Sequence, residues 1–276
     1  MNKLLSEIKI VPLLQEDLNS FSELTPDGWG DITLVYQLHY GQAYFFPIKL
    51  IHKKKIIGVA ELILNKNTGW LGNIVVSKTY RNNGLGRVLT QRLVEMAKAK
   101  KCKSIYLLAT PLGKSVYEKL GFIENGKYLF FKTTEKSITE YFSNNIITYH
   151  PKYKNEILQL DREANGEDRS EVLALHLEDV LIYKQEGEEK INGFFFPTLA
   201  NGLIICNNQH AGLELIKKRE AMGNNTIALP EACTETIRFL QQRNYKEYRQ
   251  ATFMHIGAMK IWKPQMIYSR IGGYLG

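Results

Sequence analysis

The sequence lacks the features that would place the chain in a membrane, in a disulfide scaffold or around a metal. No apolar run reaches the roughly 18 residues of a membrane span, and charges interrupt the N-terminal MNKLLSEIKIVPLLQEDL. The three cysteines, Cys102, Cys206 and Cys233, form no C-x-x-C pair, and the six histidines are scattered. We therefore expect reduced thiols, no metal site, no membrane partner and a cytoplasmic protein.

The composition is that of a globular protein with an excess of positive charge. The 276 residues, of which 44% are hydrophobic, suffice for one large or two ordinary domains. The net charge of +8 invites a nucleic-acid partner. However, the lysines lie in short patches at 53–55 and 98–103, with no arginine-rich helix or aromatic ribonucleoprotein motif. We interpret them as solvated turns and helix ends that help to attract a polyanionic ligand, and we do not expect nucleic acid.

The stretch from Ile74 to Lys100 joins an apolar strand, a glycine-bearing loop and an amphipathic helix. Arg81, Gly84 and Gly86 form the pattern R-x-x-G-x-G. The apolar residues behind it recur at three- and four-residue spacing, at Leu85, Val88, Leu89, Leu93, Met96 and Ala97. The loop is thus a helix N-terminus, where unpaired N–H groups and the helix dipole favour a phosphate.

Two other phosphate-binding loops are excluded. A P-loop requires Lys-Ser or Lys-Thr after its second glycine, and a dinucleotide loop requires three glycines and a later acidic residue. Neither pattern is present around Gly86. Without further context, the pattern would equally fit an ordinary glycine-bearing helix start.

A second motif follows about 20 residues later. SIYLLAT, at 104–110, predicts a strand that ends at Thr110, a helix N-cap. Pro111 then occupies the first helical position and Gly121 ends the helix, which contains KSVYEKLGF at 114–122.

The order and separation of these motifs resemble the GNAT superfamily of N-acetyltransferases. The resemblance implies that backbone amides of the R/Q-x-x-G-x-G/A loop hold the pyrophosphate of acetyl-CoA, while 114–122 is similar to the second GNAT signature. The cofactor-binding residues expected from it are Ile74, Val75, Val76, Arg81, Asn82, Asn83, Gly84, Leu85, Gly86, Arg87 and Thr90. For Thr90, the expected contact is between its hydroxyl and a phosphate of the cofactor. The alternative is that the Thr90 hydroxyl contacts only solvent.

The resemblance also implies direct acetyl transfer to an amine. Such a reaction needs a base, an oxyanion donor and an acid. Tyr117 is the expected acid. The alternative is that Tyr117 is an aromatic side chain of the hydrophobic core without a catalytic role. The N–H groups of Val75 and Val76 are expected to pair with pantetheine and polarise the acetyl carbonyl. Glu61 is the candidate base, directly or through water, and a surface-facing glutamate is the alternative.

The first half of the chain predicts an antiparallel meander followed by alternating helices and strands. We expect a strand at 8–13, a helix from Glu16 to about Pro26, and either a helix or an extended arm at 31–40. The remaining strands are expected at 47–52, 55–65, 70–76, 104–110 and 127–133. The resemblance implies that this mixed sheet is splayed near its centre, where acetyl-CoA enters.

The second half predicts the same architecture again. A polar stretch at 133–145 separates the halves, which gives a catalytic domain at 1–135, a linker at 136–145 and a second domain at 146–276. Strands are expected at 146–151, 180–198 as a hairpin, 202–208, 226–230 and 245–256. Helices are expected at 210–222 and 234–242, and a helical pattern at 154–178 is broken at Asn165-Gly166. The fold class is α/β with a mixed sheet: two tandem GNAT-like folds, each a splayed, mostly antiparallel sheet flanked by helices.

The second copy lacks the residues of the first. Gln209 to Gly212 replace the cradle, and Leu240 stands where Tyr117 stands in the first copy. We therefore expect a degenerate domain that shapes substrate binding or dimerisation. Its loop LDREANGEDRS, at 160–170, resembles bacterial tandem GNAT proteins with a D-x-x-A-x-G-x-D-R-S loop.

The acceptor is expected to be a small-molecule or peptide amine. Asp168 is suited to a cationic amine and Arg169 to a carboxylate, which together indicate an amino-acid-like substrate. Exposed strand edges are compatible with a homodimer. The alternative function is a CoA-binding sensor or scaffold without turnover.

Overall fold

The computed structural model describes residues 3–135 and 141–275, which form two compact units. Within the described residues, unit 1 runs to Ile123 and adds Met254–Ala258 and Gly273–Leu275, whereas unit 2 comprises Glu124–Phe253 and Met259–Gly272. This division differs from the sequential one, because two short C-terminal segments pack with the N-terminal residues. Within the predicted linker at 136–145, residues 136–140 lie outside the described residues.

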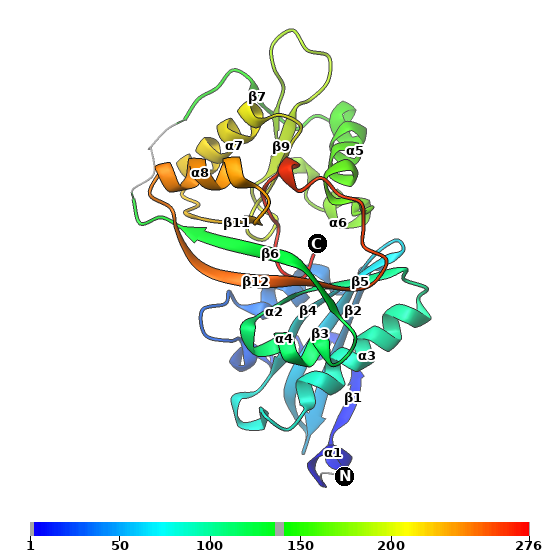
Figure 1. Ribbon diagram of the computed structural model, residues 1–276. Helices are drawn as coiled ribbons and strands as arrows, with labels where there is room; N and C mark the ends of the chain where they lie inside the picture. Colours follow the sequence, from blue (N-terminus) through cyan, green and yellow to red (C-terminus); the bar gives the residue numbers. More distant parts are fainter. Residues whose placement is uncertain (1–2, 136–140, 276) are drawn as a thin grey trace. The chain divides into compact units, whose positions relative to one another are not determined.

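Unit 1 is built on a mixed sheet (Figure 1). Its own strands are β1 (Lys9–Pro12), β2 (Phe45–His52), β3 (Lys55–Asn65), β4 (Thr68–Val76) and β5 (Ser104–Ala109). The first four form an antiparallel meander, β4 and β5 are parallel, and β5 is also hydrogen-bonded to β12 (Lys246–Gly257). The predicted meander and mixed sheet are confirmed.

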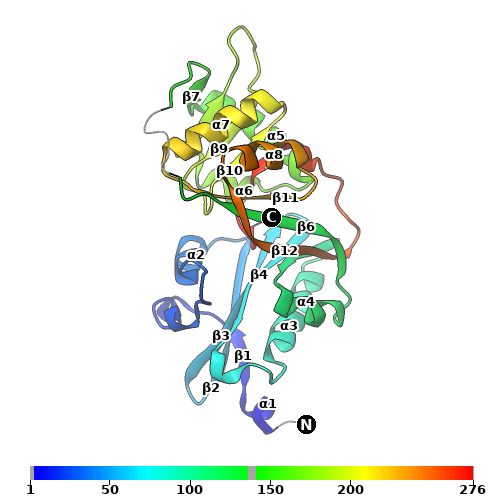
Figure 2. The same ribbon diagram turned by 60° about the vertical axis from the view of Figure 1, so that its left-hand side comes forward.

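Helices cover both faces of this sheet. They are α1 (Lys3–Glu7), α2 (Ile32–His39), α3 (Leu85–Ala99) and α4 (Pro111–Glu118). Figure 2 shows α2 on one face and α3 and α4 on the other. The predicted apolar stripe of α3 is confirmed, because Leu85, Leu89 and Leu93 are buried in the core that α3 shares with the sheet.

The first turns of unit 1 partly contradict the sequence expectation. The segment at 31–40 is helical, with the Asp31 carboxylate accepting a hydrogen bond from the Thr33 N–H. The expected helix from Glu16 is wrong, since only short 3₁₀ turns form at Gln15–Asp17 and Ser22–Leu24. Asp17 explains the first turn, because its carboxylate binds the Leu14 N–H and the Lys49 ammonium instead of facing solvent along a helix.

Unit 2 repeats the alternation of helices and strands. Its elements are β6 (Ile123–Lys132), β7 (Ile146–Thr148), α5 (Lys154–Asn165), α6 (Ser170–Ala174), β8 (Leu181–Tyr183), β9 (Gly193–Phe196), β10 (Leu203–Cys206), α7 (Gln209–Ala221), β11 (Thr226–Pro230), α8 (Thr234–Gln242) and β13 (Ile267–Ser269).

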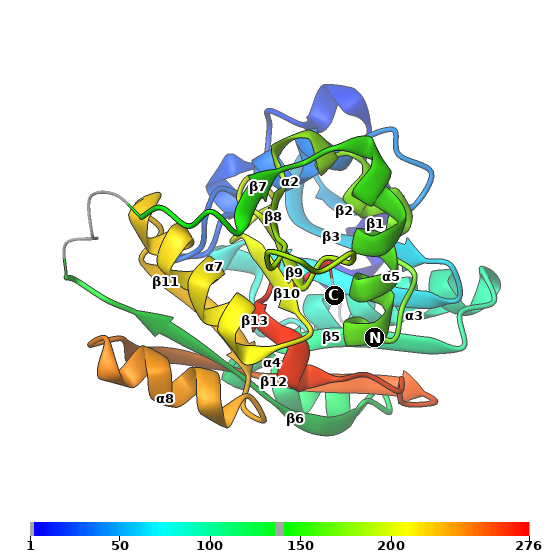
Figure 3. The same ribbon diagram turned by 90° about the horizontal axis from the view of Figure 1, so that it is seen from above.

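Five strands of unit 2 form an antiparallel sheet with the order β13-β10-β9-β8-β7. Figure 3 shows α5 and α7 on opposite sides of β9 and β10. Elsewhere in the unit, β6 lies between β11 and β12.

Candidate active site

The loop before α3 forms an open cradle at a helix N-terminus. Gly84 is the N-cap with φ +78°, and it provides no side chain to cap the helix. A Cβ built on Gly84 or Gly86 would meet nothing within 4 Å, so the space in front of the first turn is clear. The first N–H groups of a helix have no intrahelical partner, and here they remain available to an anion.

Polar side chains fix the shape of this cradle. The Arg81 Nε donates to the Val76 carbonyl (3.2 Å), and the Asn83 Nδ2 donates to the Tyr80 and Arg81 carbonyls (3.2 and 3.0 Å). Asn82 has a left-handed φ of +63°, which asparagine tolerates better than most residues. These side chains therefore hold the loop, while its backbone amides are left for a ligand.

The expected role of Thr90 is wrong. Thr90 is fully buried, and its Oγ1 donates to the Gly86 carbonyl one turn earlier at 2.8 Å. A hydroxyl used in this way inside the helix cannot reach a phosphate at the helix N-terminus.

The sheet splays next to the cradle. Parallel pairing of β4 with β5 ends at Trp70 and Tyr106, although β4 continues to Val76 and β5 to Ala109. On its other side β4 carries a bulge, because Val59 pairs with Val75 but Glu61 pairs with Gly72. Asn73, inside the bulge, has φ +42°. The bulge bends β4 away from β5 and opens the sheet between them.

The alternation of the antiparallel ladder decides which amides face this opening. The Ser77 N–H donates to the Ile57 carbonyl at 2.8 Å, and Val59 pairs with Val75 two residues further on. The Val75 N–H therefore faces β3, whereas those of Ile74 and Val76 point away from it. Of the two N–H groups expected to pair with pantetheine, that of Val76 points away from β3 and that of Val75 does not. The N–H of Ile74, which was expected to bind the cofactor, points the same way as that of Val76.

Glu61 is fully buried beside the bulge. Its Oε1 accepts a hydrogen bond from the Asn73 Nδ2 at 2.9 Å, and Tyr36 faces the carboxyl from α2. Burial raises the pKa of Glu61 to about 8, although Tyr36 and Asn73 partly offset this effect. The reading of Glu61 as a surface glutamate is thus wrong, and a carboxyl that ionises near pH 8 suits a general base.

The elevated pKa of Glu61 predicts a pH-dependent stability. Between pH 4.5 and about 8 the unfolded chain has lost the Glu61 proton while the folded chain retains it, so stability falls as pH rises. The loss amounts to about 1.4 kcal/mol for each pH unit in this range. We expect Glu61→Gln to be increasingly more stable than the wild type across the range in urea unfolding. A difference independent of pH would contradict the buried, protonated carboxyl.

Tyr117 lies on α4, whose predicted start is confirmed and which ends at Glu118, earlier than expected. Thr110 Oγ1 caps the helix by accepting from the Gly113 N–H at 3.3 Å, and Gly121 follows its end with φ +89°. The Tyr117 ring packs edge-on against Phe122, with the centroids 6.0 Å apart. Burial raises the pKa of Tyr117 to about 12, so its hydroxyl holds a proton at neutral pH. This protonation state is the one that an acid requires.

The expected substrate role of Arg169 is wrong. Its guanidinium is 1% exposed and forms a buried ion pair with Asp161, so it presents no surface to a substrate carboxylate. Asp168 accepts a hydrogen bond from Arg162 (3.1 Å) and from the Ser170 N–H (3.1 Å). The contacts of the loop at 160–170 thus connect α5 with α6 inside unit 2. Removing either member of the buried Arg169–Asp161 pair would leave an uncompensated charge in the interior.

Unit 2 closes the position that corresponds to the cradle. The N-cap of α7 is Asn208, whose Oδ1 accepts a hydrogen bond from the Ala211 N–H at 2.9 Å. A Cβ on Gly212 would lie 2.2 Å from the Tyr268 ring, so β13 packs directly on the first turn. Leu240, in the place of Tyr117, is fully buried in the core of unit 2.

We therefore predict one acetyl-CoA per chain. Unit 1 has an uncapped helix N-terminus, whereas a side chain and a ring occupy the equivalent place in unit 2. Calorimetric titration should give a stoichiometry of one. Two equivalents bound with similar affinity would contradict the closure of unit 2.

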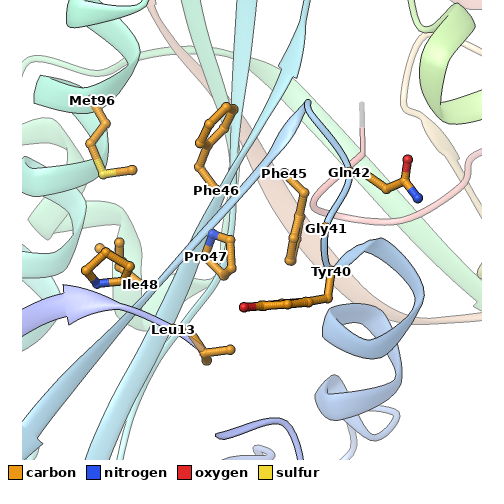
Figure 4. Close-up of a pocket in the computed structure, with 10 residues that line it drawn as sticks. Leu13, Tyr40, Gly41, Gln42, Phe45, Phe46, Pro47, Ile48 and Met96 are labelled. Atoms are coloured by element: carbon orange, nitrogen blue, oxygen red, sulfur yellow. The ribbon is translucent and has the colours of Figure 1, made fainter. Parts of the chain in front are cut away.

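An apolar cavity of about 320 Å³ also lies in unit 1, away from the cradle (Figure 4). Pro47 in its wall pairs with Glu61 across β2 and β3, but Glu61 does not line the cavity. Its lining is Pro12, Leu13, Tyr40, Gly41, Gln42, Phe45, Phe46, Pro47, Ile48 and Met96. The lining has no carboxylate that could act as a base and includes no residue of the cradle.

Unit 1 thus contains an anion cradle, a splayed sheet, a buried carboxyl and a protonated phenol, which are groups that acyl transfer can use. A model described as the acetyltransferase (GNAT) family matches residues 12–122, and one described as an acetyltransferase (GNAT) domain matches residues 157–268. The chain therefore belongs to the GNAT family of acetyltransferases, with two GNAT domains in tandem. Members of this family use acetyl-CoA as co-substrate.

Similar proteins agree with this assignment. Over 75 residues the chain is 32% identical to a glucosamine 6-phosphate N-acetyltransferase of Trypanosoma brucei brucei, a match that covers 25% of the chain and 51% of that enzyme. The fold of a protein described as an acetyltransferase from Pyrococcus horikoshii superposes with a TM-score of 0.85 at 17% identity, covering 98% of this chain and 96% of that one. A tandem GNAT protein from the clavulanic acid biosynthesis pathway gives a TM-score of 0.62 at 11% identity, with coverages of 92% and 100%.

Neither a metal cluster nor a membrane span is found among residues 3–135 and 141–275. No group of three or more His, Cys, Asp or Glu side chains in this part of the chain is arranged to hold a metal. None of its helices is long and apolar enough to cross a membrane.

Proposed function

We propose that unit 1 transfers the acetyl group of acetyl-CoA to a primary amine by direct attack. The observation that carries this proposal is the open helix N-terminus at Gly84 to Arg87 beside the splay of β4 and β5. The cradle amides would hold the pyrophosphate, and the N–H groups of Ile74 and Val76 would pair with pantetheine and the acetyl carbonyl.

Glu61 and Tyr117 have complementary roles in this proposal. An attacking amine must lose a proton, for which the Glu61 carboxylate, reached directly or through water, is the base. The departing thiolate must gain a proton, which the Tyr117 hydroxyl supplies. The amine attacks the thioester carbonyl, the tetrahedral oxyanion collapses, and the carbon–sulfur bond breaks. Burial gives the two groups pKa values of about 8 and about 12, which keeps the acid protonated when the base is ionised.

Unit 2 has no catalytic role in this proposal. Its cradle is capped by Asn208 and covered by Tyr268, and Leu240 has no proton to give. The alternative is a CoA-binding sensor or scaffold without turnover, and these replacements leave only unit 1 to bind CoA in that case as well. In unit 1 the candidates for these roles, Tyr117, Glu61 and the cradle at Gly84, are all retained, which supports turnover there.

The test is release of free thiol from acetyl-CoA in the presence of an amine panel. The panel contains glucosamine 6-phosphate, on which the trypanosomal relative is named to act, together with polyamines, amino acids and a lysine peptide. We expect at least one amine to accelerate thiol release well above the rate with acetyl-CoA alone. Tight acetyl-CoA binding with no acceleration by any amine would favour the sensor instead.

A further inference from the structure

The C-terminal residues Gly273–Leu275 belong to unit 1, although the residues before them, Met259–Gly272, belong to unit 2. Leu275 is fully buried and anchors this short segment, which we call the tail. Tyr274, beside it, makes an edge-on ring contact with His39 of α2, with centroids 6.3 Å apart. The tail is therefore packed into unit 1.

The tail lies across the splay. A Cβ on Gly72 would be 2.3 Å from the Tyr274 Cβ, and one on Gly273 would be 4.0 Å from the Leu108 Cβ. Gly72 and Leu108 each lie two residues beyond the last β4–β5 pair, Trp70 and Tyr106. The tail thus packs directly on β4 and lies near β5 just after the two strands separate, and only glycine at position 72 leaves room for it.

The tail occupies the α2 face of the splay. Glu61 and Gly72 are direct cross-strand partners, so a side chain at either position projects from the same face. Leu62 and Leu71, their chain neighbours, pack in the core with α3 on the opposite face. Tyr274 therefore covers Glu61 from the side opposite α3, and the cradle at the α3 N-terminus is not obstructed by this contact.

Several elements surround the Glu61 carboxyl. Tyr36 faces it from α2, Asn73 from β4 and Tyr274 from the tail. Burial raises the pKa of Tyr274, and the negative charges of Glu61 and Tyr44 raise it further. His39 contacts the Tyr274 ring, and its Nδ1 lies 3.0 Å from the Tyr44 hydroxyl, so this histidine borders the group. Among these neighbours there is no cation, so exclusion of water is the dominant influence on Glu61.

We propose that Tyr274 is a positioning residue of the active site in unit 1, which closes the α2 face of the splay and keeps water from the Glu61 carboxyl. The positioning role rests on the proposed function, since it acts through Glu61 as the base. The shielding itself does not depend on acetyl transfer. A residue close to the C-terminus thereby sets the pH range in which the base is ionised.

The test is a ¹³C NMR titration of protein labelled at the glutamate side-chain carboxyls. The Glu61 resonance is assigned by its loss in Glu61→Gln, and in the wild type it should titrate near pH 8. Tyr274→Ala admits water, and we expect the midpoint of the Glu61 titration to fall by about one pH unit or more. Tyr274→Phe is the matched control, because it keeps the ring and should retain the titration near pH 8.

Two further measurements separate shielding from damage to the fold. A water-soluble carbodiimide with glycine amide should label Glu61 in Tyr274→Ala but not in the wild type, as read by mass spectrometry. If Tyr274→Ala does not fold, Leu275→Ala weakens the anchor of the tail without changing the ring, and should move the titration in the same direction. Unchanged acetyl-CoA affinity in calorimetry shows that the cradle is intact.

The outcomes separate this proposal from the proposed function. A Glu61 titration that stays near pH 8 in folded Tyr274→Ala, with Glu61 unlabelled, overturns the shielding. A change in Tyr274→Phe as large as in Tyr274→Ala overturns the role of the ring. A wild type that binds acetyl-CoA but acetylates no amine removes the proposed function, whereas a lowered Glu61 pKa in Tyr274→Ala would still support the shielding.

Discussion

Tyr117→Phe is expected to lower kcat by about 10²- to 10⁴-fold, the usual contribution of a general acid, with little change in acetyl-CoA affinity. Phenylalanine keeps the ring that packs on Phe122 but has no proton for the departing thiolate. The free-thiol assay gives the rate, and calorimetric titration gives the affinity.

The matched control for this variant is Tyr248→Phe. Tyr248 is an exposed tyrosine on β12 in unit 2, and the loss of its hydroxyl should leave kcat unchanged. Full activity of Tyr117→Phe would remove Tyr117 as the acid. A parallel loss of acetyl-CoA binding would instead assign the hydroxyl to cofactor binding.

Gly86→Glu is expected to weaken acetyl-CoA binding by about 100-fold or more. The position lies in the first turn of α3, where a new side chain meets open space, so the variant should fold. The carboxylate would then lie where the pyrophosphate is expected. Loss of one or two charge-assisted hydrogen bonds, at about 1.5–3 kcal/mol each, accounts for this factor.

Two controls separate charge from shape in this experiment. Gly86→Ala adds a Cβ without charge and should keep most of the affinity. Gly223→Glu in unit 2 adds the same charge away from the cradle, at a glycine with open space but a φ of +82° that strains any side chain. Once circular dichroism shows that this variant folds, its acetyl-CoA binding should be unchanged. Equal affinity of wild type and Gly86→Glu would place acetyl-CoA elsewhere than on Arg81 to Arg87.

The motifs of unit 1 were readable in the sequence because they depend on local backbone geometry. Gly84 and Thr110 mark helix starts through backbone conformation or a side-chain bond, and the structure confirms both, whereas α4 ends at Glu118, before Gly121. The apolar period of α3 likewise predicted its buried face. The absence of a second cradle followed from Gln209 to Gly212, and Asn208 and Tyr268 show how that position is filled.

The predictions for Thr90 and Arg169 are wrong because each side chain has a partner that residue type and spacing do not reveal. Thr90 has the position of a phosphate ligand along the helix, yet it bonds within α3. Arg169 looked available beside Asp168, but Asp161 pairs with it in the interior. Asn73 lies in the strand expected at 70–76 and received no role there, although its side chain donates a hydrogen bond to Glu61.

The family motifs, the helix caps, the glycine cradle and the loss of chemistry in the second copy were all determined by the sequence alone. These properties lie within short stretches, where spacing and residue type fix the backbone. Three properties emerged only from the folded chain: Glu61 is buried, Ile74 and Val76 rather than Val75 face the splay, and Tyr274 covers the carboxyl. Burial and pairing across strands depend on residues up to about 200 positions apart in the chain, and no local pattern records them.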